Sequence, residues 1–185
     1  MKIKDGDITS VVAYGSLVYA VEYETKTVRI LQRLGSEWMQ YHVIHLDGIS
    51  ATANWISLSI SNGKLFACDL SNDALYTYTT NGVLVDKCGR YGSGVGETND
   101  PFICGSDAEG AVMVADFRNN RLQVRDSANE WHVINLQPEV RRPLRAVLLD
   151  GALFVVSRPY LGECSLIKYN WTHYFAYKLK CWFWK

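Results

Sequence analysis

The chain has 185 residues, of which 48% are hydrophobic, 21% charged and 12% aromatic, and 19 basic side chains balance 19 acidic ones. This composition is that of a globular protein and excludes a disordered tail, a collagen-like rod and a coiled coil, each of which needs a stronger bias. Zero net charge argues against a protein that grips nucleic acid or an anionic membrane with its whole surface, but it is compatible with a local basic patch.

Neither the N-terminus nor the cysteines indicate a secreted or membrane protein. Residues 1–7 are charged and precede no apolar run of the length of a signal peptide, and no stretch approaches the roughly 20 apolar residues of a membrane span. The five cysteines are widely spaced and never form a CxxC pair, so the sequence indicates neither a disulfide framework nor a zinc site. We expect a cytoplasmic protein with no cofactor, no metal and no membrane contact.

One pattern of four short strands recurs along the chain. The first unit has apolar or alternating segments at 8–14, 15–22, 28–31 and 39–46, and the second at 55–60, 63–69, 75–78 and 83–85. The third has them at 102–106, 110–116, 122–125 and 132–136, and the fourth at 144–149, 151–157, 166–169 and 174–179. The glycines that open the second segments, Gly15, Gly63, Gly110 and Gly151, are 48, 47 and 41 residues apart.

Four strands per unit, a period in the forties and no convincing helix predict an all-β protein, a β-propeller with about four four-stranded blades. Asn62-Gly63 and Asp150-Gly151 are dipeptides typical of tight hairpin turns, since glycine adopts positive φ without strain. We expect one domain over 1–185, with blades at approximately 7–47, 48–98, 99–140 and 141–185.

The third unit resembles an NHL repeat. The glycine-rich segment 89–96, Pro101, the Val-Ala-Asp of 114–116 and the Asn-Arg-Leu-Gln-Val of 120–124 stand at the spacing of that family. The other units keep the spacing and lose the motif: the second has Asp69 and Asn72 but Ala74 in place of the arginine, the first has Glu22 and Thr27, and the fourth has Ser157. Because NHL propellers normally close with six blades, the resemblance implies an incomplete six-bladed propeller.

The resemblance also implies a function. NHL propellers form the C-terminal domain of tripartite-motif ubiquitin ligases, where they recruit protein targets or, in several members, RNA hairpins. The chain contains no RING, B-box or coiled-coil segment, so ubiquitin-ligase activity is not expected in it. We expect a non-catalytic recognition module that binds a protein partner.

The most motif-like polar group is Asp116, Asn119, Asn120 and Arg121. We favour a structural role for these residues over a functional one. The Asp and Asn side chains are expected to cap the turn, and Arg121 to connect neighbouring strands or blades. The glycine run 89–96 leads into a strand and lacks a Gly-Lys-Ser/Thr ending, which argues for an interblade linker rather than a phosphate-binding loop.

Arginines and aromatic residues share the loops that should emerge on one face of the propeller. The predicted interaction residues are Arg90, Tyr91, Phe117, Arg118, Arg121, Arg141, Arg142, Arg158 and Tyr160. Guanidinium groups interleaved with flat rings suit either an acidic peptide or single-stranded RNA, so RNA binding is the first alternative function. The plainer interpretation, slightly favoured, is a solvated rim neutralised by Glu97, Asp100, Asp116 and Glu139.

A propeller enzyme of the lyase or lactonase type is the second alternative. No nucleophile elbow, HExxH or other catalytic motif is present, and no catalytic residue is predicted. The four histidines, His42, His45, His132 and His173, fall in the outer predicted strands, far from a central channel. Because an open array of blades leaves sheet faces uncovered, we also expect self-association through the open blade edges.

Overall fold

The computed structural model describes residues 7–150, 152–159 and 163–170. The strands are β1 Ile8–Tyr14, β2 Leu17–Glu22, β3 Thr27–Leu34, β4 Glu37–His45, β5 Ile56–Ser61, β6 Lys64–Asp69, β7 Ala74–Thr79, β8 Leu84–Cys88, β9 Pro101–Ser106, β10 Val112–Asp116, β11 Arg121–Arg125, β12 Trp131–Asn135, β13 Pro143–Leu149, β14 Ala152–Ser157 and β15 Ser165–Asn170. The strand predicted at 174–179 lies outside the described residues.

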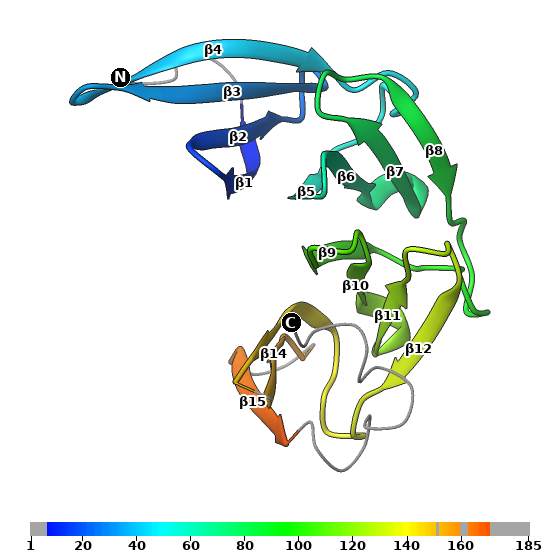
Figure 1. Cartoon of the computed structure of the whole chain (residues 1–185). Helices are drawn as coiled ribbons and strands as arrows, with labels where there is room; N and C mark the ends of the chain where they lie inside the picture. The colour runs from blue at the N-terminus through cyan, green and yellow to red at the C-terminus, as the bar shows by residue number, and fades with distance from the viewer. Residues whose placement is uncertain (1–6, 151, 160–162, 171–185) are drawn as a thin grey trace.

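The strands form four antiparallel sheets, each paired in chain order. Three sheets have four strands, β1 to β4, β5 to β8 and β9 to β12, and the fourth contains β13, β14 and β15 within the described part of the chain. Figure 1 shows the sheets as blades on an open arc, with β1, β5 and β9 along its inner side. The arrangement confirms the all-β prediction of a β-propeller with four blades.

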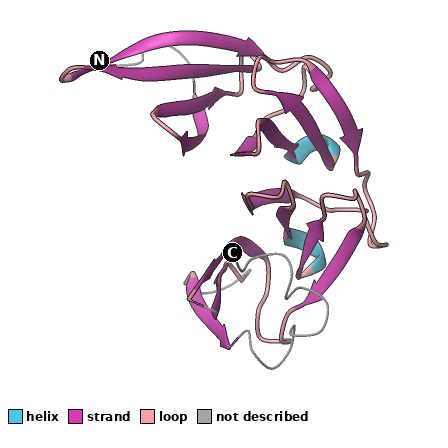
Figure 2. Cartoon of the chain, viewed as in Figure 1, coloured by secondary structure: helices cyan, strands magenta, loops and turns pink. Residues whose placement is uncertain are grey.

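The turns follow from the sequence. Asn62 and Gly63, with φ of 46° and 67°, join the paired residues Ser61 and Lys64 as a two-residue hairpin, as the Asn-Gly dipeptide predicts. Two short 3-10 helices, Leu70–Asn72 and Phe117–Asn119, connect the second and third strands of the middle blades (Figure 2).

The core lies between the blades rather than inside any one of them. The first and second sheets enclose residues such as Val21, Ile44 and Tyr78, and the third and fourth enclose Leu122 and Leu153. A third cluster, between the second and third sheets, contains Phe66, Cys68, Leu75, Ile103, Val112 and Val114. A middle sheet is therefore buried on both faces, which explains why its second strand, β6 or β10, carries a continuous apolar run.

Cys68 lies in the core and Cys88 and Cys104 are partly buried; burial raises the pKa of the Cys88 and Cys104 thiols to about 11. Within the described ranges, no helix is long and apolar enough to cross a membrane.

The outer faces of the two end sheets carry exposed apolar side chains. In the fourth sheet, Val147 and Leu166 are 55% and 68% exposed, while their neighbours Leu148 and Ile167 pack toward the third sheet. In the first sheet, Val11 is 60% exposed. Successive residues of a strand point to opposite faces, so these side chains lie where a further blade would pack.

We expect the 185-residue chain to self-associate through these faces, and Leu166→Glu to raise the dissociation constant of the complex at least about tenfold, because it places a charge in an apolar contact. Size-exclusion chromatography with light scattering over a concentration series measures this. Val83→Glu is the matched control, since Val83 is exposed in the β7–β8 turn. A stable wild-type monomer at all concentrations would contradict the expectation.

Candidate functional site

The carboxylate of Asp116, at the end of β10, is a buried hub of hydrogen bonds. It accepts from the backbone N–H of Asn99 at 2.8 Å, from Nδ2 of Asn119 at 2.9 Å, from Nε of Arg121 at 2.7 Å and from Nε2 of Gln123 at 3.1 Å. Asp116 is fully buried, so these donors replace the water that the carboxylate loses.

Arg121 joins this hub to the linker between the second and third blades. Its terminal nitrogens donate to the backbone oxygens of Ser93 at 2.8 Å, Gly94 at 2.7 Å and Glu97 at 3.0 Å, and its side chain is 12% exposed. Asn120 extends the connection to the fourth blade, because its Oδ1 accepts from the backbone N–H of Arg142 at 2.9 Å. This polar group therefore holds blades together, which agrees with the structural interpretation of the sequence.

The other blades have comparable polar contacts after the second strand, made by different residues. Asp69 accepts from the backbone of Ser71 at 3.0 Å and from Asn72 at 2.6 Å. Buried Glu22 pairs with Arg29 at 3.1 Å. In the fourth blade the hydroxyl of Ser157 bonds the backbone of Arg141. The turn chemistry thus persists in the blades where the sequence motif has faded.

Three of the predicted arginines gather between the third and fourth blades. The Arg142 guanidinium lies 5.1 Å from the centre of the Phe117 ring, and the backbone N–H of Arg158 donates to the Arg142 carbonyl at 3.1 Å. The pKa of Arg142 is lowered, first by loss of hydration and then by repulsion from Arg118 and Arg158. Arg118 forms an ion pair with Asp100. The site therefore concentrates positive charge.

A row of aromatic rings continues the cluster toward the inner strands. The rings of Phe117 and Phe102 are 5.8 Å apart and those of Phe102 and Trp55 are 6.5 Å apart, both edge to face. The Arg145 guanidinium lies 5.4 Å from the Phe102 ring. Trp55 is 40% exposed. We define the arginine–aromatic surface as Trp55, Phe102, Phe117, Arg118, Arg142, Arg145 and Arg158.

The remaining predicted site residues lie apart from this surface or within the fold. Arg90 is exposed on the linker and pairs with Glu97 at 2.7 Å, and Tyr91 beside it is 71% exposed. Backbone N–H groups of the linker and Arg90 lower the pKa of Glu97. Arg121 is partly buried, Arg141 is exposed, and Tyr160 lies outside the described residues.

Sequence reasoning missed Trp55, Phe102 and Arg145 as site residues. Trp55 directly precedes β5, Phe102 is the second residue of β9 and Arg145 is the third residue of β13. These strands are the innermost of successive blades, and their starts meet at one end of the propeller. Aligning the repeats would have brought these three positions together.

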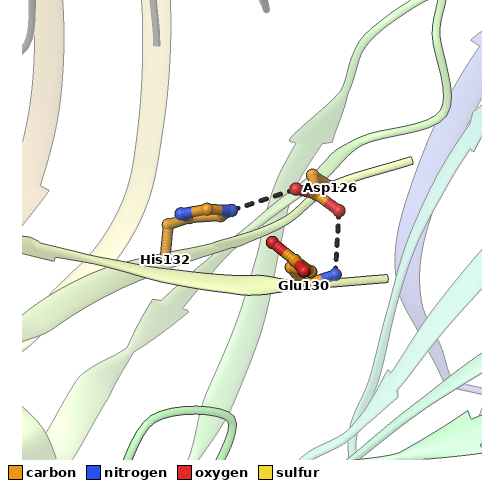
Figure 3. Close-up of side chains that lie close together, drawn as sticks. All are labelled: Asp126, Glu130 and His132. Atoms are coloured by element: carbon orange, nitrogen blue, oxygen red, sulfur yellow. Dashed lines mark hydrogen bonds and ion pairs between the residues drawn. The ribbon is translucent and has the colours of Figure 1, made fainter. Parts of the chain in front are cut away.

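Asp126, Glu130 and His132 form the one group of metal-ligating side chains with close spacing in the described part of the chain (Figure 3), with ligand atoms within 4.8 Å of one another. One oxygen of Asp126 accepts from the backbone N–H of Glu130 at 2.8 Å, and the other lies 3.0 Å from Nε2 of His132. Burial acts to raise the pKa of Asp126, but these hydrogen bonds lower it overall. The contacts close the β11–β12 hairpin, and we assign no metal to them.

No protein-family model matches the chain, and the search of curated proteins gives no match. Solved structures do resemble it. A structural-genomics protein of unknown function from Bacteroides thetaiotaomicron has a TM-score of 0.62 at 16% identity, over 81% of this chain and 44% of that one. A streptogramin B lyase has a TM-score of 0.63 at 11% identity, over 90% of this chain and 56% of that one.

The computationally designed Ika4 protein has a TM-score of 0.53 at 10% identity, over 88% of this chain and 91% of that one. The chain thus spans about half the length of the first two proteins. These likenesses establish a shared fold. The chain is a β-propeller. At these identities, the activity of a similar propeller does not transfer with its architecture.

We expect Arg121→Met to lower the free energy of unfolding by about 3 kcal/mol, because it removes the guanidinium partner of the buried Asp116 carboxylate together with its hydrogen bonds to three linker carbonyls. Urea unfolding followed by tryptophan fluorescence measures the loss. Arg118→Met is the matched control, and it should cost less than about 1 kcal/mol because its ion pair is exposed. Equal losses in the two variants would show that Arg121 does not hold the linker.

Proposed function

We propose that the protein is a non-catalytic recognition module that binds an acidic segment of a protein partner at the arginine–aromatic surface. The observation that supports this most directly is the crowding of Arg118, Arg142 and Arg158, with the Arg142 guanidinium 5.1 Å from the centre of the Phe117 ring. Loss of hydration and then repulsion from Arg118 and Arg158 lower the pKa of Arg142, against attraction by Asp100. A carboxylate placed among them relieves that repulsion and gains charge-assisted hydrogen bonds. Arginine and aromatic side chains are also the residues that most often carry binding energy in protein interfaces.

The neighbouring rings add an apolar component to this site. Trp55 is partly exposed at the end of the aromatic row and lies edge to face with Phe102, the ring that the Arg145 guanidinium contacts. A partner segment that alternates carboxylates with aromatic or aliphatic side chains would use both features. This chemistry fits the role that the NHL resemblance implies, in which a cytoplasmic propeller recruits protein targets for a ubiquitin ligase whose catalytic domain lies elsewhere.

The positions of the three histidines in the described part of the chain support a role without catalysis, and His173 lies outside that part. His42 and His45 are in β4 and His132 is in β12, and both strands are the outermost of their sheets. A catalytic centre in a propeller of this shape is expected where the inner strands meet, because ligands bind at concave sites between elements.

We expect a fluorescein-labelled octapeptide of alternating Glu and Phe to bind, and Arg142→Ala combined with Arg158→Ala to weaken binding at least about tenfold, because two guanidinium partners are lost. Fluorescence anisotropy at moderate salt measures this. Arg33→Ala removes one positive charge from an exposed position in β3 and should leave the affinity unchanged.

Binding of a labelled octauridylate, measured in the same way, tests the alternative function, which is RNA binding. If the oligonucleotide binds more tightly than the peptide and loses affinity in the double arginine variant, the surface is an RNA-binding site and the peptide proposal fails. If neither probe binds, or if the Arg33 variant is as impaired as the double variant, the surface has no recognition role.

The absence of catalysis is tested with the ligand of a similar propeller. Virginiamycin B lyase from Staphylococcus aureus, whose catalytically inactive variant was solved with quinupristin, has a TM-score of 0.61 to this chain at 12% identity. We expect no loss of quinupristin on incubation with this protein, with or without added Mg²⁺, as followed by liquid chromatography. Turnover that follows the protein concentration would contradict the proposal and favour a lyase.

A further inference from the structure

A polar cleft of about 320 Å³ lies between the second and third blades. Its lining includes Lys64 at the start of β6, Gly110 in the β9–β10 turn and Asn129 in the β11–β12 turn. The arginine–aromatic surface lies at the starts of β5 and β9, and the cleft lies beyond the ends of these strands. The two sites therefore occupy opposite ends of the blades.

Two buried polar groups in the cleft have no hydrogen-bond partner among the described residues. They are the hydroxyl of Thr77, a residue that is 4% exposed, and the Nε–H of Arg125, whose side chain is 10% exposed. Both residues line the cleft. A buried donor or hydroxyl without a partner is unfavourable, so a ligand or an ordered water that supplied a partner to these two atoms would be stabilising.

The charges that line the cleft cancel. Lys64 and Arg125 are positive, Asp86 and Asp126 are negative, and Nη2 of Arg125 bonds Oδ2 of Asp86 at 2.6 Å across the two blades. An anionic ligand would be repelled by the carboxylates and a cationic one by Lys64 and Arg125. A neutral ligand avoids both penalties.

We propose that this cleft binds a neutral polyhydroxylated molecule of about the size of a monosaccharide. A sugar hydroxyl both donates and accepts, so neighbouring hydroxyls can accept from Arg125 and Lys64 while they donate to Asp86 and Asp126. Thr77 is paired directly opposite Asp86 on β7 and β8, and both residues belong to the lining. The volume lies at the lower end of the range for small-molecule sites.

A second cleft lies between the first and second blades, and its lining differs. It is lined by Leu17, Tyr19, Ile30 and Tyr41 together with Thr80 of the β7–β8 turn. The orphan polar atoms found in the described residues include none from that lining. Orphaned polar groups thus distinguish the cleft between the second and third blades, and the inference stands independently of the proposed recognition function.

The test uses the full chain and D-glucose, D-galactose and D-mannose as probes, followed by saturation-transfer NMR and titration, with Thr77→Val as the variant. Valine matches threonine in shape and removes the unpaired hydroxyl, so the free variant should melt at the same temperature or higher. At least one hexose should bind saturably to the wild type and lose about tenfold or more in affinity in the variant. Thr80→Val, outside the cleft, should bind as the wild type does.

Charged analogues decide the ligand class. D-Glucuronate and D-glucosamine should bind at least about tenfold more weakly than the neutral hexose, because each brings a charge into a balanced lining. The proposal is overturned if no neutral hexose binds saturably, if a charged analogue binds more tightly, or if Thr77→Val lowers the melting temperature of the free protein, which would show that the hydroxyl serves the fold.

Discussion

Burial of the Asp116 carboxylate is the constraint on which the third blade and its surroundings depend. An ionised group removed from water must find donors, and Asp116 finds them in the linker, in the following turn and in β11. Arg121 is one of these donors, and it also donates to three backbone carbonyls of the linker. The path of residues 89–100 is thereby fixed, and with it the point at which β9 starts and the position of Phe102.

The arginine–aromatic surface is a consequence of this framework. Phe117 follows Asp116 in the same turn. Asn120, three residues after Phe117, accepts a hydrogen bond from the backbone N–H of Arg142. The framework therefore fixes the backbone that carries these groups, while the ion pair with Asp100 holds the Arg118 side chain and the Phe117 ring lies against that of Arg142. A preorganised site loses less conformational entropy on binding than one that must assemble.

The repeat in the sequence predicts the fold well because hairpin turns and alternating strands are local signals. Asn62-Gly63 specifies its turn by itself, and the glycine spacing places the blades. The site is harder to predict, because Trp55, Phe102 and Arg145 belong to three different blades and meet only when the inner strands pack together. The burial of Arg121 is a property of the linker that folds over it, and the orphaned hydroxyl of Thr77 is visible only once its neighbours are placed. Neither the burial of the arginine nor the missing partner of the hydroxyl can be inferred from the type of residue alone.

The zero net charge conceals an uneven distribution. At one end of the third and fourth blades lie Arg118, Arg142 and Arg158, and at the other the turns carry Asp107, Glu109, Asp126 and Glu130. These side chains contribute a dipole moment along the blades, even though the total charge is zero. An approaching anion exerts a torque on the protein that turns its basic end toward the anion before contact, and at about 0.1 M salt this torque is screened at separations beyond a Debye length of about 10 Å.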